Sequence, residues 1–329
     1  MSRRRLGVVD YRDGVRSGDR RLVAKTITLL ESRRADVAAL GQAVLEELVP
    51  YTGGGIRVGI SGTPGVGKST FIEALGLELI AAGHRVAVLA VDPSSPRSGG
   101  SILGDKTRMQ RLAREERAFI RPSPSQGTLG GVAHRTRESL LVCEAAGFDV
   151  VVVETVGIGQ SEVAVAGMVD FFAVLLQPGA GDELQGIKRG ALELADALVV
   201  SKADGDQLAL AERTRVAYTH AIQLMRPTSP HWKTPVLAVS ARHGTGIAGF
   251  WEAVLAHRRA LEASGELATR RRRQARAWLW SLVEEGLREH LRSHPAVAGR
   301  IPLLEKEVEA LRMTPAAAAR EILDVLRSV

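Results

Sequence analysis

The chain has 329 residues, 45% of them hydrophobic and 25% charged, with a net charge of +7 from 44 basic and 37 acidic side chains. This is the composition of an ordinary globular protein; the basic excess favours phosphate-bearing partners, but only 4% of the residues are aromatic, too few for a base-stacking surface. No apolar run approaches the roughly 20 residues of a membrane span, and no apolar stretch follows the basic N-terminus. We therefore expect a cytoplasmic protein with neither a nucleic-acid nor a membrane partner.

The N-terminal segment is predicted to be helical. Apolar side chains such as Leu22 and Ile27 recur at helical spacing through about the first 50 residues. Pro50 and the glycines at 53–55 then break the pattern. These features define an N-terminal helical extension over residues 1–52.

From residue 53 the pattern changes to short, valine-rich runs separated by helix-length segments. Such runs are typical of a parallel sheet that helices cover on both faces. Seven runs fit this description: Ile56–Ile60, Val86–Val91, Ala118–Ile120, Val150–Val153, Phe171–Leu176, Ala197–Val200 and Val236–Val239. We therefore predict a doubly wound, mainly parallel α/β domain over residues 53–262.

The C-terminal residues 263–329 are predicted to form a second helical extension. Helices are expected over 266–292 and 303–327, and Thr314-Pro315 is a favourable start for a helix. The first of these helices carries an apolar stripe that must be buried against the α/β domain, a second copy of the chain or another protein. The stripe comprises Trp278, Leu279, Leu282 and Leu287.

A phosphate-binding motif follows the first predicted strand. It reads Gly62-Thr63-Pro64-Gly65-Val66-Gly67-Lys68-Ser69, with Thr70 next, and it opens an apolar helix. Glycines allow the loop to curl so that backbone N–H groups point at phosphate oxygens, and the helix N-terminus adds a favourable dipole. Lys68 is expected to contact the β- and γ-phosphates, and the Ser69 hydroxyl to bind Mg²⁺.

Two acidic segments are candidate switch elements. Asp92 ends the second strand, and a stretch rich in proline, serine and glycine separates it from Asp105. Glu154 ends the fourth strand and is followed three residues later by Gly157, whose N–H is suited to contacting a γ-phosphate. We expect Asp92 or Asp105, together with Ser69, to serve the metal, and Glu154 to hold a metal-bound water or position the attacking water.

The motif Ser201-Lys202-Ala203-Asp204 follows the sixth strand and indicates a guanine reader. The Asp204 carboxylate can accept from both N1–H and the exocyclic amine of guanine, a donor pair that adenine lacks. The stem of Lys202 can lie along the base, and Ser240-Ala241 fits the loop whose backbone N–H meets the guanine O6. The sequence therefore favours GTP over ATP.

These motifs, in this order, resemble those of P-loop GTPases of the signal-recognition, MinD and BioD class. More narrowly, they resemble the MeaB family, the G-protein chaperones of adenosylcobalamin-dependent methylmalonyl-CoA mutase. The resemblance covers essentially the whole chain and rests on residues 61–70, Asp92–Pro96, Glu154–Glu162 and Gln177–Glu183. Position 201 is a departure, because the base motif usually has Asn where this chain has Ser, and we expect weaker anchoring of the base loop there.

The resemblance implies a homodimer held by the C-terminal helices and a slow, Mg²⁺-dependent GTPase that the mutase accelerates. It also implies gated cobalamin delivery and protection of the mutase. In that family the segment matching Gln177 to Lys188 is a further switch, so Gln177, Asp182, Gln185 and Lys188 are carried over as residues that couple nucleotide state to the partner.

Other functions remain open on the residues alone. A nickel-insertion or other enzyme-maturation GTPase of the same class would need a metal site, for which His290 and His294 beside Glu289 are the suggestive residues. A signal-recognition GTPase would need a methionine-rich domain, and the chain has five methionines. A small-molecule kinase would need an acceptor pocket, and a structural dimer would need no intact phosphate site. The single Cys143 excludes a disulfide framework.

Overall fold

The chain divides into two compact units, Met1–Gln274 and Ala275–Val329. The first unit contains the sheet and the second contains only helices among its described residues. In the computed structural model the described residues are 6–32, 34–91, 109–122, 129–155, 161–179 and 189–327.

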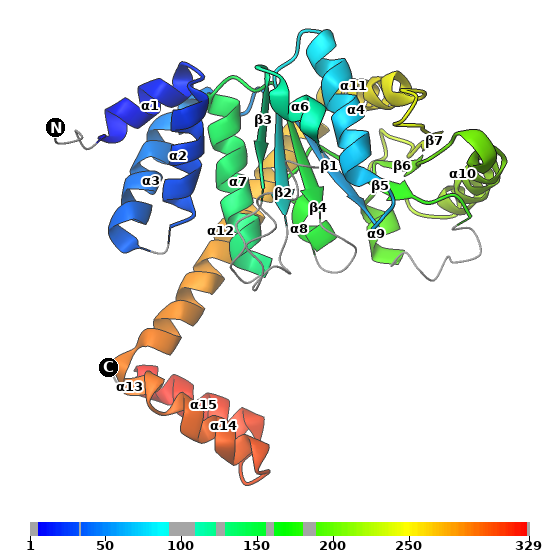
Figure 1. The fold of residues 1–329 in the computed structure, drawn as a ribbon. Coiled ribbons are helices and arrows are strands. Elements are labelled where there is room, and N and C mark those ends of the chain that lie inside the picture. The colour runs from blue at the N-terminus through cyan, green and yellow to red at the C-terminus, as the bar shows by residue number, and fades with distance from the viewer. Residues whose placement is uncertain are drawn as a thin grey trace. The chain divides into compact units, whose positions relative to one another are not determined.

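The N-terminal residues form helices, as predicted. The turn at Gly18, where φ is +77°, separates the first helix from the second, and the Asp19 side chain caps the second by accepting from the amides of Arg21 and Leu22. The helices pack on one another and on α7 (Leu129–Ala145) through a shared apolar core (Figure 1). Their bounds are α1 Val8–Arg16, α2 Arg20–Leu30, α3 Ala35–Leu48 and the short η1 Val49–Tyr51.

The sheet has seven strands, all of them parallel, in the order β3-β2-β4-β1-β5-β6-β7. This confirms the predicted doubly wound α/β fold. The strands are β1 Ile56–Gly62, β2 Val86–Val91, β3 Ala118–Arg121, β4 Val150–Thr155, β5 Phe171–Leu176, β6 Ala197–Val200 and β7 Val236–Ala238. Strands β1 and β4 each run two residues past the apolar run in the sequence, because backbone pairing such as Ile60 with Glu154 continues where the side chains become polar.

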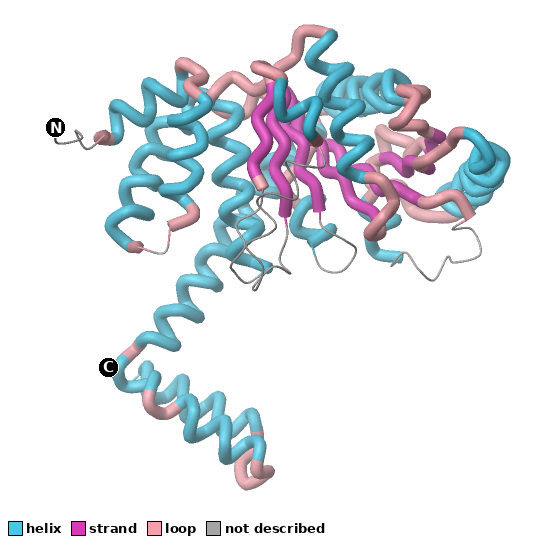
Figure 2. The backbone as a smooth tube through the Cα atoms, viewed as in Figure 1, coloured by secondary structure: helices cyan, strands magenta, loops and turns pink. Residues whose placement is uncertain are grey.

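Helices cover both faces of the sheet (Figures 1 and 2). Along β4, Val150 and Val152 enter one apolar core while Val151 and Val153 enter the other, as the alternation of side chains along a strand requires. The first core is completed by α4 Lys68–Ala81, α6 Gln110–Arg114 and α11 Ile247–Ala263. The second is completed by α7, α8 Ser161–Ala166, α9 Arg189–Leu194 and α10 Leu208–Gln223, with Cys143 buried in it.

The C-terminal helices differ from the prediction at one point. Helix α12 spans Glu266–Ser293, close to the expected 266–292, but the expected helix over 303–327 is in fact two helices. Leu311 adopts a left-handed φ of +55° at the break, and the Thr314 hydroxyl accepts from the amide of Ala317. Pro315 disfavours a helical conformation in the residue before it, so a new helix must begin there.

The remaining C-terminal bounds are α13 Pro295–Ala298, α14 Ile301–Glu309 and α15 Pro315–Arg327. Across the described parts of the chain, no helix combines the length and the apolarity needed to cross a membrane.

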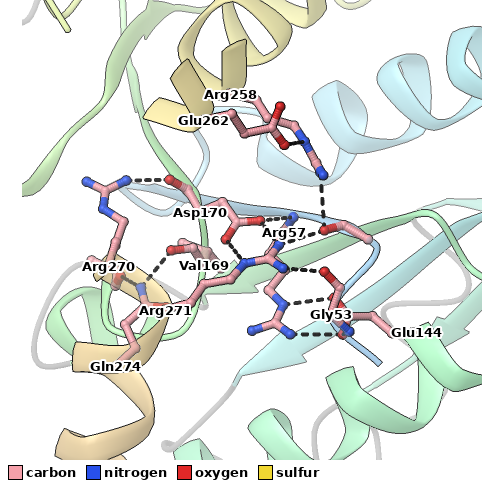
Figure 3. Close-up of polar contacts among 12 residues, drawn as sticks. Gly53, Arg57, Glu144, Val169, Asp170, Arg258, Glu262, Arg270, Arg271 and Gln274 are labelled. Carbon is pink, nitrogen blue, oxygen red and sulfur yellow. Dashed lines mark hydrogen bonds and ion pairs between the residues drawn. The ribbon is translucent and has the colours of Figure 1, made fainter. Parts of the chain in front are cut away.

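Two arginines of the run at 270–273 form ion pairs with buried carboxylates at the amino edge of the sheet (Figure 3). Arg271 contacts both carboxylate oxygens of Asp170, at 2.7 and 2.6 Å, and its Nη2 donates to the Gly55 carbonyl at 2.8 Å. Arg270 contacts both oxygens of Asp196, at 3.1 and 3.0 Å. These arginines therefore hold the start of α12 against the strands rather than forming a basic surface.

Two further residues extend this group, which we call the edge cluster: Arg57, Glu144, Asp170, Asp196, Arg270 and Arg271. Arg57 contacts Glu144 through two nitrogens, at 2.9 and 2.8 Å. Three carboxylates thus balance three guanidinium groups. Burial by itself raises the pKa of Asp196, but His257, 3.5 Å away, and Arg270 together bring that pKa below its ordinary value.

Candidate nucleotide-binding site

The phosphate motif forms a tight loop between β1 and α4. Gly65 and Gly67 adopt φ angles of +77° and +99°, which side chains other than glycine rarely allow. A Cβ at Gly62 would lie 2.7 Å from the Leu175 carbonyl, so the close approach of β5 requires glycine there as well. The sequence thus folds locally into a loop whose backbone curls around one point, as a phosphate cradle requires.

Lys68 is the first residue of α4 and is 8% exposed. Its Nζ donates to the carbonyls of Gly62 at 2.7 Å and Thr63 at 3.1 Å, both within the loop itself. The ammonium group therefore lies over the loop, at the N-terminal end of the helix. Both features favour an anion at this position.

Ser69, on α4, and Glu154, on β4, lie side by side. The Ser69 hydroxyl donates to the Glu154 carboxylate at 3.1 Å, and Glu154, near the end of β4, is 5% exposed. The next residue, Thr155, donates to the Ser61 hydroxyl of β1 at 2.9 Å and fixes the two strand ends together. A hydroxyl and a carboxylate side by side are oxygen ligands that suit Mg²⁺.

Several predicted switch residues lie outside the described part of the chain. They are Asp92, Asp105 and Gly157 from the metal and γ-phosphate predictions, and Asp182, Gln185 and Lys188 from the coupling segment. Their roles stay predictions.

The base motif is tied to the phosphate loop by two side chains. The Ser201 hydroxyl is buried and lies 2.7 Å from the Val66 carbonyl and 3.1 Å from that of Leu176. Lys202, with a φ of +54°, donates from Nζ to the Gly65 carbonyl at 2.8 Å. Serine in place of the usual asparagine therefore still connects the base loop to the phosphate loop; its effect on guanine affinity stays a prediction.

The Asp204 carboxylate faces the loop after β7. The Ser240 hydroxyl donates to Asp204 Oδ2 and accepts from the amide of His243 at 3.3 Å. The amide of Ser240 donates to the Thr245 carbonyl at 2.9 Å. Since that amide is engaged, the expected contact to a guanine O6 falls to Ala241, while the Ser240 side chain orients Asp204.

A hollow of about 320 Å³ lies between the phosphate loop and the base motif. This volume is at the lower end of the range for small-molecule sites. The predicted residues that line it are Val66, Gly67, Thr70, Lys202, Asp204 and Ala241. Phe71, Gln207 and Arg242 line it too, and sequence reasoning missed them, although Gln207 and Arg242 stand within three residues of the predicted Asp204 and Ala241.

The beginning of the predicted coupling segment lies beside the phosphate loop. A Cβ at Gly65 would be 3.8 Å from Gln177 Nε2. The amide of Gly179 donates to the Thr214 hydroxyl of α10 at 2.9 Å. Residues 177–179 therefore connect the loop region to a surface helix.

The histidine pair considered for a metal lies in the second unit. The rings of His290 and His294 are 5.7 Å apart, edge to face. Among the described residues, no group of three or more histidine, cysteine, aspartate or glutamate side chains is placed to hold a metal ion.

The chain is similar to known proteins in both sequence and fold. The family model described as "Methylmalonyl Co-A mutase-associated GTPase MeaB" matches residues 23–296. The chain is 50% identical over 277 residues to GTPase ArgK of Escherichia coli, covering 84% of each protein. It is 46% identical over 328 residues to the mitochondrial methylmalonic aciduria type A homolog of Mus musculus, covering 96% of this chain and 78% of that protein.

Among solved structures, the fold matches the crystal structure of a LAO/AO transport system kinase. The TM-score is 0.78 with 38% sequence identity, and the match covers 97% of each chain. The similarity therefore extends over both the α/β region and the helical extensions.

Proposed function

The chain belongs to the MeaB family of P-loop GTPases, and we propose that it is a Mg²⁺-dependent GTP-hydrolysing switch that serves an adenosylcobalamin-dependent methylmalonyl-CoA mutase. Its output is a conformational signal to that enzyme, which gates cobalamin loading and protects the mutase from inactivation. The proposal places the protein in the cytoplasm and gives it GTP and GDP as ligands.

One observation carries the proposal: three functional groups meet at the carboxyl edge of the sheet. Lys68 lies over the phosphate loop after β1, the Ser69–Glu154 pair stands at the end of β4, and Asp204 faces the hollow after β6. Ligands of open parallel sheets bind at this edge. These groups suit the three parts of a Mg²⁺-bound guanine nucleotide. The loop suits the phosphates, the pair of oxygen ligands suits the metal, and the Asp204 carboxylate suits the base.

Each group has a distinct role in this proposal. Lys68 and the loop amides bind the β- and γ-phosphates, and Ser69 and Glu154 would hold Mg²⁺, which when bound neutralises phosphate charge. Glu154 orients the attacking water, and Asp204, fixed by the Ser240 hydroxyl, accepts from guanine. Carboxylate hydrogen bonds of about 1.5–3 kcal/mol each give strong discrimination against adenine.

The test is nucleotide turnover by purified protein, with GTP and ATP compared, alone and with added mutase. We expect GTP-selective hydrolysis that the mutase accelerates and that Lys68→Ala abolishes. Lys25→Ala is the matched control, because Lys25 is an exposed lysine on α2 and its loss should leave turnover unchanged.

Each outcome bears on a different part of the proposal. Equal use of ATP would overturn the role of Asp204 as a guanine reader. Selective hydrolysis that ignores the mutase would keep the GTPase and remove the partner. Turnover that survives Lys68→Ala would show that the phosphate loop is not the site.

A further inference from the structure

Helix α8 lies directly after the predicted γ-phosphate sensor in the chain. It begins at Ser161, four residues beyond Gly157, and it packs on the strand that leads into the phosphate loop. A Cβ at Gly59 of β1 would lie 2.9 Å from Val165 and 3.0 Å from Val169. Val165 lies in α8 and Val169 lies just after it, so the end of α8 and the turn that follows pack too closely on β1 to shift without β1 responding.

The carboxyl end of α8 is held by side chains from two other helices. Helix ends leave backbone carbonyls without partners inside the helix. Gln274 of α12 donates from Nε2 to the carbonyls of Val169 at 2.8 Å and Ala166 at 3.3 Å (Figure 3). Arg137 of α7 donates to the Gly167 carbonyl at 2.8 Å.

Arg137 and Gln274 also contact each other. Arg137 Nη1 donates to the main-chain carbonyl of Gln274 at 3.5 Å, and burial lowers the pKa of Arg137. A partly buried guanidinium that donates to the backbone carbonyls of Gly167 and Gln274 ties the positions of these two segments together. The end of α8 and the first turns of α12 thus form one hydrogen-bonded unit.

The first turns of α12 are also the part of that helix fixed by the edge cluster. Arg270 and Arg271 are paired there with Asp196 and Asp170, whereas Gln274 is the residue that reaches α8. Gln274 is the last residue of the first compact unit, and α12 continues beyond it to Ser293. A displacement of the end of α8 would therefore act on α12 through Gln274, the last residue before the second unit.

We propose that α8 and Gln274 form a relay that couples the γ-phosphate state of the nucleotide site to the stability of the α12 segment 266–274. The relay rests on the proposed GTPase function. A contact made in one nucleotide state and weakened in the other changes how often the backbone of 266–274 opens. Because coupling is reciprocal, whatever binds α12 then alters nucleotide affinity by the same factor.

Amide hydrogen exchange on the full-length protein tests the relay. Exchange is followed in segments 161–169 and 266–274 with Mg²⁺ and either GDP or a non-hydrolysable GTP analogue. We expect both segments of the wild type to differ between the two nucleotides by roughly fivefold or more in protection. Gln274→Ala should weaken the difference in 266–274, because only the 3.5 Å contact from Arg137 to the main-chain carbonyl of residue 274 then joins the two elements, and should keep the difference in 161–169.

Two further variants make the result specific. Arg272→Ala is the matched control, since Arg272 is an exposed neighbour on α12 whose side chain donates to the nearby Thr269 hydroxyl. It should behave as the wild type. Gln274→Glu keeps the length of the side chain but replaces the donor amide by an acceptor, so it should weaken the coupling as Gln274→Ala does.

The relay is refuted if the wild type responds in 161–169 but not in 266–274, or if both Gln274 variants keep the full response. Either result would leave α12 fixed by the edge cluster alone and indifferent to nucleotide. Failure of the proposed function would look different. The protein would then neither bind the two nucleotides in a fluorescence titration nor hydrolyse GTP.

Discussion

Two side chains connect segments that are 135 and more residues apart in the chain. Ser201 reaches the Val66 carbonyl and Lys202 reaches the Gly65 carbonyl, so the base motif and the phosphate loop hold each other in place. A nucleotide that contacts both segments would bind a site whose two halves are already positioned. Preorganisation of this kind contributes to affinity because less motion is lost on binding.

Ser201→Ala is therefore expected to weaken nucleotide binding. Loss of one buried hydrogen bond costs about 0.5–1.5 kcal/mol, and the Val66 carbonyl would be left without this donor. We expect the Kd for a fluorescent GDP analogue to rise roughly two- to tenfold, as measured by titration. Ser264→Ala, which removes an exposed hydroxyl bonded to the nearby Leu261 carbonyl, is the control. Unchanged affinity in Ser201→Ala would show that the hydrogen bond from Ser201 to the Val66 carbonyl, the tether between the two loops, is dispensable.

At the scale of single residues, the sequence predicted those functional side chains that belong to short motifs with a fixed spacing. Lys68, Ser69 and Asp204 stand in short motifs after strand-like runs, and the structure places them at one sheet edge. Gln207 and Arg242 belong to no such motif, and only the folded chain brings them to the same hollow. The tether from Ser201 to Val66 was missed for the same reason, because nothing local marks a contact across 135 residues.

At the scale of elements, the edge cluster fixes where α12 begins. Arg270 joins Asp196, which precedes β6, and Arg271 joins Asp170, which precedes β5. Buried ion pairs contribute little net stability compared with apolar packing. Removing one partner is nevertheless costly, because the other charge is then buried without a counter-charge. The cluster thus acts mainly to specify one position for the start of the helix.

Arg270→Ala should destabilise the first unit by about 3–5 kcal/mol, because it leaves the buried carboxylate of Asp196 without its guanidinium partner. Urea unfolding at neutral pH measures the change. Arg272→Ala, in the same run but exposed, should stay within about 0.5 kcal/mol of the wild type. Equal effects of the two substitutions would mean that the ion pair does not matter.

The difference in the free energy of unfolding between the wild type and Arg270→Ala should depend on pH, because Asp196 is the partner of Arg270. Its pKa is lower in the folded protein than ordinary, so the contribution of its ionised form is present near neutral pH and is lost as the pH falls through the folded pKa. The gap between the wild type and Arg270→Ala should therefore narrow on acidification.

The elements themselves were largely predictable from periodicity. All seven strands and their parallel arrangement followed from valine-rich runs alternating with helix-length segments. The single helix predicted over 303–327 was wrong because the apolar pattern alone spans the break, whereas the helix start predicted at Thr314-Pro315 coincides with the beginning of α15. The arginine run could not be interpreted from the sequence, since its partners lie 74 and 101 residues away.

At the scale of the whole molecule, the second unit presents large apolar side chains that its own helices leave uncovered. On α12 these are Leu279, Trp280, Leu282, Val283 and Leu287. Soluble chains rarely expose such a group unless another surface covers it. We propose that a second copy of the same helix covers them, as in the homodimer that the family resemblance implies, since in a two-fold interface each side chain is buried twice.

Leu287→Glu is expected to prevent this association. Leu287 is 63% exposed, and a carboxylate in its place would have to be desolvated on both sides of a two-fold interface. Loss of two buried leucines alone corresponds to about 3 kcal/mol or more, so the dimer Kd should rise by at least roughly a hundredfold. Light scattering coupled to size-exclusion chromatography should show a dimer for the wild type and a monomer for the variant.

Leu311→Glu provides the matched control, because Leu311 is 92% exposed in the same unit but lies in the turn between α14 and α15. It should remain dimeric, and both variants should bind GDP as the wild type does, since neither residue lines the nucleotide hollow. A monomeric wild type would contradict the homodimer. A dimer that survives Leu287→Glu would move the interface away from the α12 stripe, and the stripe would then need a different partner to cover it.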